Sequence, residues 1–487
     1  MTQKQNSPAI VWFRDDLRLA DQPALAAAIA TGAPVLCVFI LDEESPGARA
    51  HGGAARWWLH HSLAALGASL DAIGGRLDLL RGPGAATIEA VARATGAGHV
   101  FWTRRYGPAD VAIDADAKAR LKALGVEAVS HNGQLLHEPW TVKTGAGGYF
   151  KVFTPFWRAA RALPPPPQPM PAPGKMIGAA WPAAAPARVD LAKLLPLPTK
   201  PDWAGGLRAT WRPGEQGAHA RLEAFIDSGL RRYAEDRNRP DIPATSMLSP
   251  HLRFGEISPR QILAAALHAE DSGRAPARDI EKFLSEIGWR EFAYHLLFHA
   301  PDLATKNFQP KFDAFPWRAP EPGEWRAWTK GLTGYPIVDA GMRELWTTGT
   351  MHNRVRMICA SFLVKDLMID WRAGEGWFWD TLCDADPANN PASWQWVAGS
   401  GADAAPYFRV FNPTLQGEKF DPDGAYVRQH VPELARLDSK YIHKPWLAPP
   451  LELAAGGVVL GRDYPAPIID HGKARDRALA ALSSISA

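Results

Sequence analysis

The sequence predicts a doubly wound parallel α/β sheet domain followed by an all-helical domain. Up to about residue 135, short apolar runs alternate with alanine-rich helical stretches. Proline and glycine then interrupt all periodicity over residues 136–215, and only helical patterns follow. Because strands separated by helical crossovers pair in parallel, we expect a sheet domain over 1–135, a linker over 136–215 and a helical domain over 216–487.

The elements of the sheet domain follow from their apolar periods in order. We predict strands at residues 9–13, 34–41, 76–80, 99–103 and 126–130, and helices at 23–30, 56–73, 85–95 and 108–124. The first strand runs into Arg14-Asp15-Asp16-Leu17-Arg18 and not into a glycine-rich turn. A dinucleotide fingerprint is therefore absent at this sheet edge.

The linker and the helical domain are predicted from breakers and from amphipathic spacing. Leu163 is followed by four prolines, and residues 169–174 are again rich in proline and glycine, which favours extended chain. Beyond this segment the helices are expected at residues 218–226, 259–268, 280–298, 334–347 and 352–371.

Composition excludes several classes of protein. The formal net charge is only +3, so any contact with nucleic acid needs a local basic face. The three cysteines, Cys37, Cys359 and Cys383, cannot supply a four-thiolate iron–sulfur site, and no His/Cys spacing is typical of zinc. The unpaired spacing indicates a reducing cytoplasm. No apolar signal core or membrane span is expected.

Tryptophan is concentrated in one part of the chain. Ten of the twenty tryptophans lie between Trp289 and Trp396, several of them beside charged or amide residues. Tryptophan can fill a core or stack on a nucleobase, and it can also pass an electron. Composition alone leaves these uses open.

Two segments of the helical domain carry clustered polar groups. Within residues 245–258, Thr245, Ser246 and Ser249 place three hydroxyl side chains ahead of a helix, which suits phosphate oxygens but is also ordinary helix capping. Helical spacing puts Glu286, Trp289 and Arg290 on one face, where the ordinary alternative is an exposed Glu286–Arg290 ion pair.

Two later segments add amides and carboxylates. Asn353 and Met357 lie one turn apart in a predicted helix, and residues 384–396 combine Asp384 and Asp386 with two asparagines. The two prolines in that second segment predict an irregular loop. Asp384 and Asp386 lack neighbours that would complete a metal site, so no metal is expected.

Several long motifs together resemble the photolyase/cryptochrome family over nearly the whole chain, and within it the bacterial cyclobutane pyrimidine dimer photolyases. These motifs are Val11–Arg18, Gly334–Arg343, Met351–Arg354, Trp394–Trp396, Phe411–Pro413 and Gln416–Asp421.

The resemblance implies an FAD cofactor in the helical domain and an antenna chromophore in the sheet domain. The antenna is expected to be a folate, methenyltetrahydrofolate, with a deazaflavin as the alternative. Residues 102–107 depart from the Asn/Glu-containing stretch of some folate-binding members. The implied reaction is light-driven electron transfer from excited reduced FAD to a pyrimidine dimer flipped out of UV-damaged DNA. A cytoplasmic monomer that associates with the nucleoid through DNA is expected.

The resemblance also implies roles for individual residues. Expected FAD contacts are Tyr233, Arg237, Thr245, Ser246, Met247, Leu248, Ser249, Glu286, Arg356, Asp384, Asp386 and Asn390. Asn390 corresponds to the polar group beside flavin N5, although Asn389 is a neighbouring candidate. The lesion is expected to contact Glu286, Trp289, Asn353, Met357, Asn390 and Trp396.

The remaining implied roles concern electron transfer and DNA. Electrons are expected to pass through Trp394, Trp371 and Trp317, with Trp325 as a rival for the outermost place. The DNA contacts are expected at Trp289, Arg290, Arg354, Met357, Trp396, Arg409 and Lys419. The other tryptophans, including Trp325, Trp328, Trp346, Trp377 and Trp379, are expected in the core.

Alternatives within and beyond the family are less well supported by the residues. A 6-4 photolyase is expected to carry a His-His pair where this chain has His352-Asn353. A cryptochrome photoreceptor usually has a C-terminal extension beyond the point where this chain stops, soon after His471. An NAD(P)H-dependent flavoprotein would need the nicotinamide fingerprint that is missing.

Overall fold

A single parallel sheet forms the N-terminal part of the computed structural model, which describes residues 7–404 and 408–485. The strands are β1 (Ala9–Phe13), β2 (Val35–Leu41), β3 (Leu77–Arg81), β4 (His99–Thr103) and β5 (Glu127–His131), in the order β3-β2-β1-β4-β5. All neighbouring strands are parallel. Each strand begins and ends within one residue of its predicted position, and the doubly wound α/β class is confirmed.

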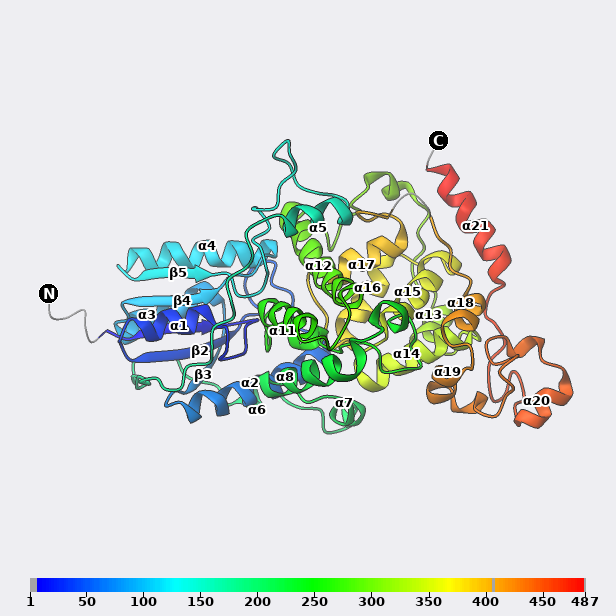
Figure 1. Ribbon diagram of the computed structural model, residues 1–487, viewed down its shortest axis with the longest axis horizontal. Helices are drawn as coiled ribbons and strands as arrows, with labels where there is room; N and C mark the ends of the chain where they lie inside the picture. The colour runs from blue at the N-terminus through cyan, green and yellow to red at the C-terminus, as the bar shows by residue number, and fades with distance from the viewer. Residues whose placement is uncertain (1–6, 405–407, 486–487) are drawn as a thin grey trace.

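Helices cover both faces of this sheet (Figure 1). Ala9, Val11 and Phe13 pack with α1 (Pro23–Ala30) and α2 (Gly53–Ala72). Ile10 and Trp12 pack instead with α3 (Gly84–Thr95) and α4 (Pro108–Ala123). Successive side chains of a strand point to opposite faces, so a continuous apolar strand is what a sheet buried on both sides requires.

The segment predicted as a linker contains structure that the prolines did not indicate. Residues 163–174 lack helices and strands, as expected, but α5 (Phe153–Arg161) precedes them, and α6 (Leu191–Leu194) and α7 (Gly205–Thr210) follow. Phe156 of α5 packs on Phe292 with ring centroids 5.2 Å apart. This apolar contact with a distant helix gives α5 a buried face. The domain boundaries at 135 and 215 stay a prediction.

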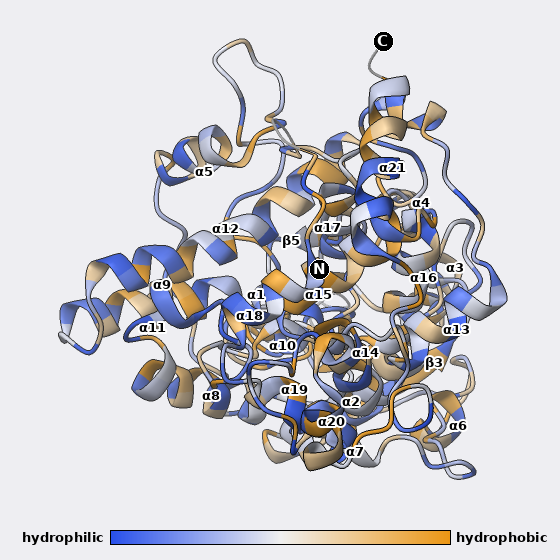
Figure 2. Ribbon diagram, turned by 90° about the vertical axis from the view of Figure 1, so that its right-hand side faces the viewer, coloured by the Kyte–Doolittle hydropathy of each residue, from blue (hydrophilic) through white to orange (hydrophobic). Residues whose placement is uncertain are grey.

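The rest of the chain is helical, as predicted (Figure 1). The helices are α8 (Glu215–Ala224), α9 (Tyr233–Asp236), α10 (Ser249–Arg253), α11 (Pro259–Asp271), α12 (Ala277–His299), α13 (Pro322–Lys330), α14 (Pro336–Thr348), α15 (Asn353–Ser361), α16 (Trp371–Thr381), α17 (Asn389–Ala398), α18 (Pro413–Phe420), α19 (Ala425–His430), α20 (Pro450–Gly456) and α21 (His471–Ser484). Hydrophobic and hydrophilic stretches alternate along the outer helices in Figure 2, as one buried face requires. None of the described helices has the length and apolar character needed to cross a bilayer.

The helix expected over residues 352–371 is two helices. α15 continues into a π-helical turn, Phe362–Asp366, and the chain then leaves the helical path at Met368, whose φ is +55°. Asp370 starts α16 by accepting a hydrogen bond from the Arg372 amide at 2.9 Å. The apolar period is continuous across this break because both helices bury a face in the same core, so periodicity could not reveal it.

The prediction of an irregular loop before Trp394 and Trp396 is also partly wrong. α17 begins at Asn389 and includes Pro391 in its first turn. The first amides of a helix have no partner within the helix, so proline costs no hydrogen bond there. The two asparagines therefore stand at a helix N-terminus.

The carboxyl edge of the sheet packs against the helical domain. Leu17 donates its amide to Phe254 O at 3.0 Å, and Asp15 pairs with Arg253 at 3.0 Å. Gly255 has a φ of +64°, and a Cβ there would lie 2.1 Å from Asp15 O, so only glycine allows this approach. Arg253 also donates to Ala385 O at 2.7 Å. The segment after β1 thus supports the loop that carries Asp384 and Asp386.

Candidate active site: a cavity in the helical domain

A cavity of about 650 Å³ lies within the helical domain, between α9, α12, α15 and α17. Most of the predicted site residues line it, although they come from segments far apart in the sequence. These are Tyr233, Arg237, Ser246, Leu248, Ser249, Glu286, Trp289, Arg290, Asn353, Arg354, Arg356, Met357, Asp384, Asp386, Asn390, Trp394 and Trp396. Thr245, Met247, Arg409, Lys419, Trp371 and Trp317 are not among its lining residues.

The predicted acid Glu286 is paired inside the cavity. It forms an ion pair with Arg237, which follows α9, and Lys282 Nζ lies 3.1 Å from its carboxylate. The ordinary alternative, an exposed Glu286–Arg290 pair, is not formed. Arg290 instead donates to Gln134 O at 2.7 Å. The ion pair therefore joins Arg237, an expected FAD contact, to Glu286, which is expected to contact both FAD and the lesion.

Cations crowd the same region. Burial lowers the pKa of Arg354, and the charges of Arg237 and Arg409 lower it further. Arg354 also donates to Asn238 at 2.9 Å and lies over the Phe420 ring. Like charges held together and partly desolvated favour the binding of an anion.

Several buried polar atoms of the cavity have no hydrogen-bond partner in the described chain. They are Nε of Arg237, Nε of Arg354 and Oδ1 of Asp384. Buried donors and acceptors are normally satisfied, because each one left unpaired costs about 1–3 kcal/mol. A ligand that carries acceptors toward the arginines would satisfy those donors.

The carboxylates of residues 384–386 have distinct partners. Asp384 pairs with Arg356 at 2.9 Å. Asp386 accepts hydrogen bonds from the amides of Ala388 and Asn389 at 2.8 and 2.7 Å, which satisfies the free amides at the start of α17. No group of three or more His, Cys, Asp or Glu side chains in the described chain could hold a metal ion.

The two asparagines point to different partners. Asn389 Nδ2 donates to Asp386 Oδ1 at 3.0 Å, whereas Asn390 Nδ2 donates to Glu375 Oε1 at 2.8 Å. Both residues line the cavity. Asn390 is the more buried of the two, with 8% of its surface exposed.

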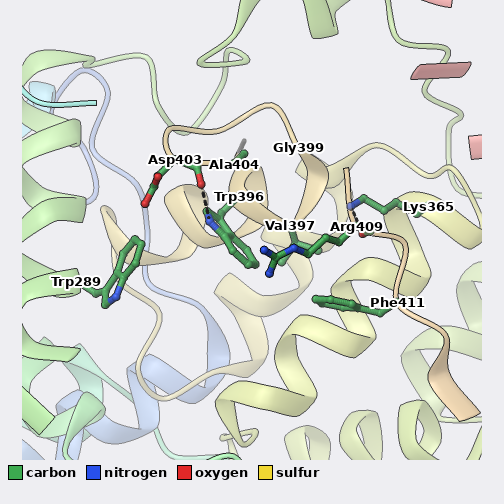
Figure 3. A pocket seen from close by; sticks show the side chains of 9 residues that line it. All are labelled: Trp289, Lys365, Trp396, Val397, Gly399, Asp403, Ala404, Arg409 and Phe411. Carbon is green, nitrogen blue, oxygen red and sulfur yellow. Dashed lines mark hydrogen bonds between the residues drawn. The ribbon is translucent and has the colours of Figure 1, made fainter. Parts of the chain in front are cut away.

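Two partly buried tryptophans lie where the large cavity meets a smaller one of about 230 Å³ (Figure 3). Trp289 stacks on Phe153, with centroids 3.9 Å apart, and Trp396 donates its indole N–H to Asp403 O at 3.1 Å. Arg409 points into the smaller cavity in Figure 3. We call Trp289, Trp396, Arg354 and Arg409 the rim.

Lys365 supports the rim and was not predicted from the sequence. It lies in the π-helical turn with only 3% of its surface exposed, and its ammonium donates to Arg409 O (Figure 3). Burial lowers the pKa of Lys365 to about 7. Lys419, by contrast, is exposed beside Phe420 on α18.

A second set of tryptophans is fully buried. Trp328, Trp371 and Trp394, which we call the buried group, have 0%, 0% and 2% of their surface exposed. Trp394 also lines the large cavity, and Gly374 of α16 leaves room for its ring, since a Cβ there would lie 2.2 Å from it. Trp371 donates its indole N–H to Asn307 at 2.9 Å.

The other tryptophans differ in burial. Trp317 is partly buried against the same core, as are Trp325 and Trp377. Trp346 was expected in the core and this is wrong, because half of its surface (50%) is exposed and its ring stacks on Trp377 under Lys330. Its position on the outer face of α14 is a tertiary property that composition does not carry.

Some residues of the site were missed because no motif marked them. Lys282 could have been found, since it lies four residues before Glu286 on one helix face. Asn238, Phe378, Leu382 and Glu375 gave no local signal, and the structure alone brings them to the cavity or to its wall.

Comparison with known proteins identifies the family of this chain. Residues 9–174 match the family model described as DNA photolyase, and residues 283–484 match the FAD binding domain of DNA photolyase. The deoxyribodipyrimidine photo-lyase of Agrobacterium fabrum is 54% identical over 483 residues, which cover 99% of this chain and 98% of that protein. Cryptochrome-1 of Arabidopsis thaliana is 39% identical, covering 98% of this chain and 70% of that protein.

A solved structure shares the fold throughout. The crystal structure of a bacterial class III photolyase from Agrobacterium tumefaciens has a TM-score of 0.94 at 54% identity, covering 99% of this chain and 98% of that chain. Family models match both the sheet domain and the helical domain, and the 54% identity extends over nearly the whole chain. The chain therefore belongs to the photolyase/cryptochrome family.

Proposed function

We propose that this chain is a deoxyribodipyrimidine photolyase that repairs cyclobutane pyrimidine dimers in DNA under light. The observation that carries the proposal is one cavity that joins a cationic, hydroxyl-lined end to an acid and two indoles, Glu286, Trp289 and Trp396. The 54% identical photo-lyase of Agrobacterium fabrum supports it over nearly the full chain. The class III photolyase structure indicates the same class for this chain.

FAD fits the donor set of the cavity. Tyr233, Arg237, Ser246, Leu248 and Ser249, which line the cavity, would hold its phosphates together with the adjacent Thr245 and Met247, and the unpartnered Arg237 Nε is available there. Arg356, Asp384, Asp386 and Asn390 would hold the ring and ribityl side. Bound FAD, reduced and excited by light, supplies the one-electron chemistry.

The chain's own residues bind and orient the lesion. Glu286 would hydrogen-bond the pyrimidine edge, as Asn353 and Met357 contact the dimer from α15 and Asn390 from α17. Trp289 and Trp396 would supply the stacking faces that replace those of the duplex. Splitting the dimer by electron transfer needs no nucleophile or general base, but a pocket that keeps water away from the bound lesion.

DNA binding would use the rim and its surroundings. Arg290, Arg354, Arg409 and Lys419 are the expected cationic contacts, with Met357 and the two rim tryptophans at the lesion. Crowding of Arg237, Arg354 and Arg409 supports a phosphate-binding role because a polyanion relieves their repulsion.

The electron path to the flavin is proposed to run through Trp394, Trp371 and Trp317. Trp394 lines the cavity, Trp371 begins the helix that packs against α17, and Trp317 is the least buried of the three. These three indoles would carry electrons from reductants in solvent toward bound FAD.

The antenna is proposed to be methenyltetrahydrofolate, with a deazaflavin as the alternative, and the protein is proposed to act as a cytoplasmic monomer. An absorption spectrum of the native protein identifies the antenna. A folate band supports methenyltetrahydrofolate, a deazaflavin band supports the alternative, and a spectrum with neither band would overturn both. Sedimentation at working concentration tests the monomer.

The function is tested by illuminating the FAD-loaded protein with DNA that carries a defined cyclobutane or 6-4 lesion and counting restored bases against a dark control. We expect repair of the cyclobutane lesion only. Glu286→Gln should slow repair, whereas Glu281→Gln, which alters an exposed carboxylate of the same helix, should not. Repair of the 6-4 lesion would identify a 6-4 photolyase. No repair of either lesion would favour the photoreceptor function suggested by the name of the 39% identical cryptochrome-1.

A further inference from the structure

A row of three side chains connects the sheet domain to the wall of the cavity. Arg49, in the loop between β2 and α2, pairs with Glu375 of α16 through two hydrogen bonds of 2.7 and 2.8 Å. Glu375 Oε1 also accepts the 2.8 Å hydrogen bond from Asn390 Nδ2. Arg49 itself does not line the cavity. It therefore reaches Asn390 only through the carboxylate.

This row determines which end of the Asn390 amide is available. Nδ2 donates to two oxygens of one residue, Glu375 Oε1 at 2.8 Å and Glu375 O at 3.1 Å. Rotating the amide by half a turn would set its oxygen against two acceptors, which is unfavourable. Oδ1 accepts no hydrogen bond within the described part of the chain, so the free end of this cavity-lining side chain is an acceptor.

Glu375 is buried and needs its cationic partner. Only 4% of its surface is exposed, and a buried carboxylate that loses its partner is costly. The guanidinium of Arg49 is in turn fixed over the Trp379 ring at 3.9 Å, and Trp379 donates to Ala50 O at 2.8 Å. The backbone at Gly52 approaches so closely that a Cβ would lie 2.2 Å from Trp379 O. The loop thus holds Arg49 in one place.

We propose that Arg49 is a positioning residue that acts on the flavin from the other domain. By holding Glu375, it keeps the Asn390 oxygen turned toward the cavity, where it accepts a hydrogen bond from the N5–H of reduced FAD. The inference rests on the proposed function in one respect, the place of Asn390 beside N5. Reduced flavin carries a proton on N5 and oxidised flavin does not, so a fixed acceptor favours the reduced form that repair requires.

The test is the midpoint potential of FAD bound to the full-length protein. In Arg49→Met we expect the preference for reduced over oxidised FAD to fall about tenfold, as for the loss of one hydrogen bond, which is about 30 mV for a two-electron couple. Reoxidation by air in the dark should be faster. Arg49→Lys keeps the positive charge but not the two parallel hydrogen bonds to Glu375. Its midpoint potential should therefore lie between those of the unsubstituted protein and Arg49→Met.

Two comparisons separate positioning from other effects. Asp380→Ala removes a hydrogen bond of 2.8 Å to Gly53 at the same domain contact, without a link to Asn390, and should leave the potential unchanged. In an Asn390→Ala background, Arg49→Met should have no further effect. A purely electrostatic effect of the lost charge would persist there. FAD content and unfolding temperature show whether each variant is folded.

An unchanged potential in Arg49→Met, or an equal shift in Asp380→Ala, overturns the inference, and so does a shift that persists without Asn390. If Asn390→Ala alone shifts the potential, the place of Asn390 stands while the role of Arg49 fails. If neither variant shifts it, both fail. Lesion repair is not used as a readout, so a protein that repairs no DNA can still support or overturn the role of Arg49.

Discussion

The rim and the buried group are both built on tryptophan, but their surroundings differ. Trp289 and Trp396 are partly buried and stand beside cations that repel one another. Trp328, Trp371 and Trp394 are almost fully buried, and Trp371 has a satisfied indole N–H. One residue type therefore serves two environments, one beside cations that repel one another and one inside the apolar core.

Under the proposed function, this difference would separate DNA binding by the rim from packing and electron transfer in the buried group. A surface that binds DNA must keep stacking faces and charges available, and it carries an electrostatic cost until the DNA arrives. A core must leave nothing unpaired. Substitutions at the rim should therefore alter DNA binding with little effect on the flavin, and substitutions in the buried group should do the reverse.

The largest effect is expected from the buried group. Trp394→Phe or Trp371→Phe should abolish photoreduction of bound FAD, because phenylalanine is harder to oxidise than tryptophan, while repair by chemically reduced protein survives. Flash spectroscopy and repair counting measure the two activities. Equal loss of both would contradict the division. Surviving photoreduction in Trp371→Phe would favour the contacting rings Trp394, Trp328 and Trp325 as the route.

The next effect concerns the rim tryptophans. Trp289→Ala or Trp396→Ala should weaken binding of lesion-containing DNA by about 1–3 kcal/mol each, the value of one stacking contact, with photoreduction unchanged. Trp140→Ala is the matched control, an exposed tryptophan that is absent from both cavities. Titration of labelled DNA measures the affinity. A matching loss in Trp140→Ala would remove the special role of the rim.

A smaller effect is expected from the rim arginines. Arg354→Ala or Arg409→Ala should reduce the slope of log affinity against log salt by about 1, with similar losses on damaged and undamaged DNA, because phosphate contacts carry no lesion information. Binding at several salt concentrations measures the slope. An unchanged slope with lost lesion preference would assign these arginines to the lesion and not to the backbone.

The smallest effect is a pH dependence at Lys365, which supports the rim. Burial lowers its pKa to about 7 in the folded chain from 10.5. Between these values the unfolded chain binds a proton that the folded chain has released, so this group makes folding more favourable as pH rises from about 7 toward 10.5. Lys365→Met should lose this rise. Urea unfolding at pH 7 and pH 9 measures the change in the free energy of unfolding with pH. The same change in the unsubstituted protein and in Lys365→Met would contradict the prediction.

Local patterns predicted much of the fold and the site, but not the partners within the site. Alternating apolar and helical segments located the five strands of the sheet, and most of the predicted site residues line one cavity. The partner of Glu286 could not be predicted, since Arg290 was near in sequence but Arg237 is near in space. Helix α5 was missed although Phe153, Phe156 and Ala160 have helical spacing, because the proline-rich segment that follows it indicated a linker.

By itself, the sequence determined the fold class, the family and the residue types of the cavity, because periodicity and motifs are properties of neighbouring residues. Only the tertiary structure decided that Arg49 would hold Glu375, a partner 326 positions away, and that Trp346 would lie outside the core. Such pairings depend on how segments that are distant in the sequence pack together, and the free energy of that packing cannot be read from any short segment alone.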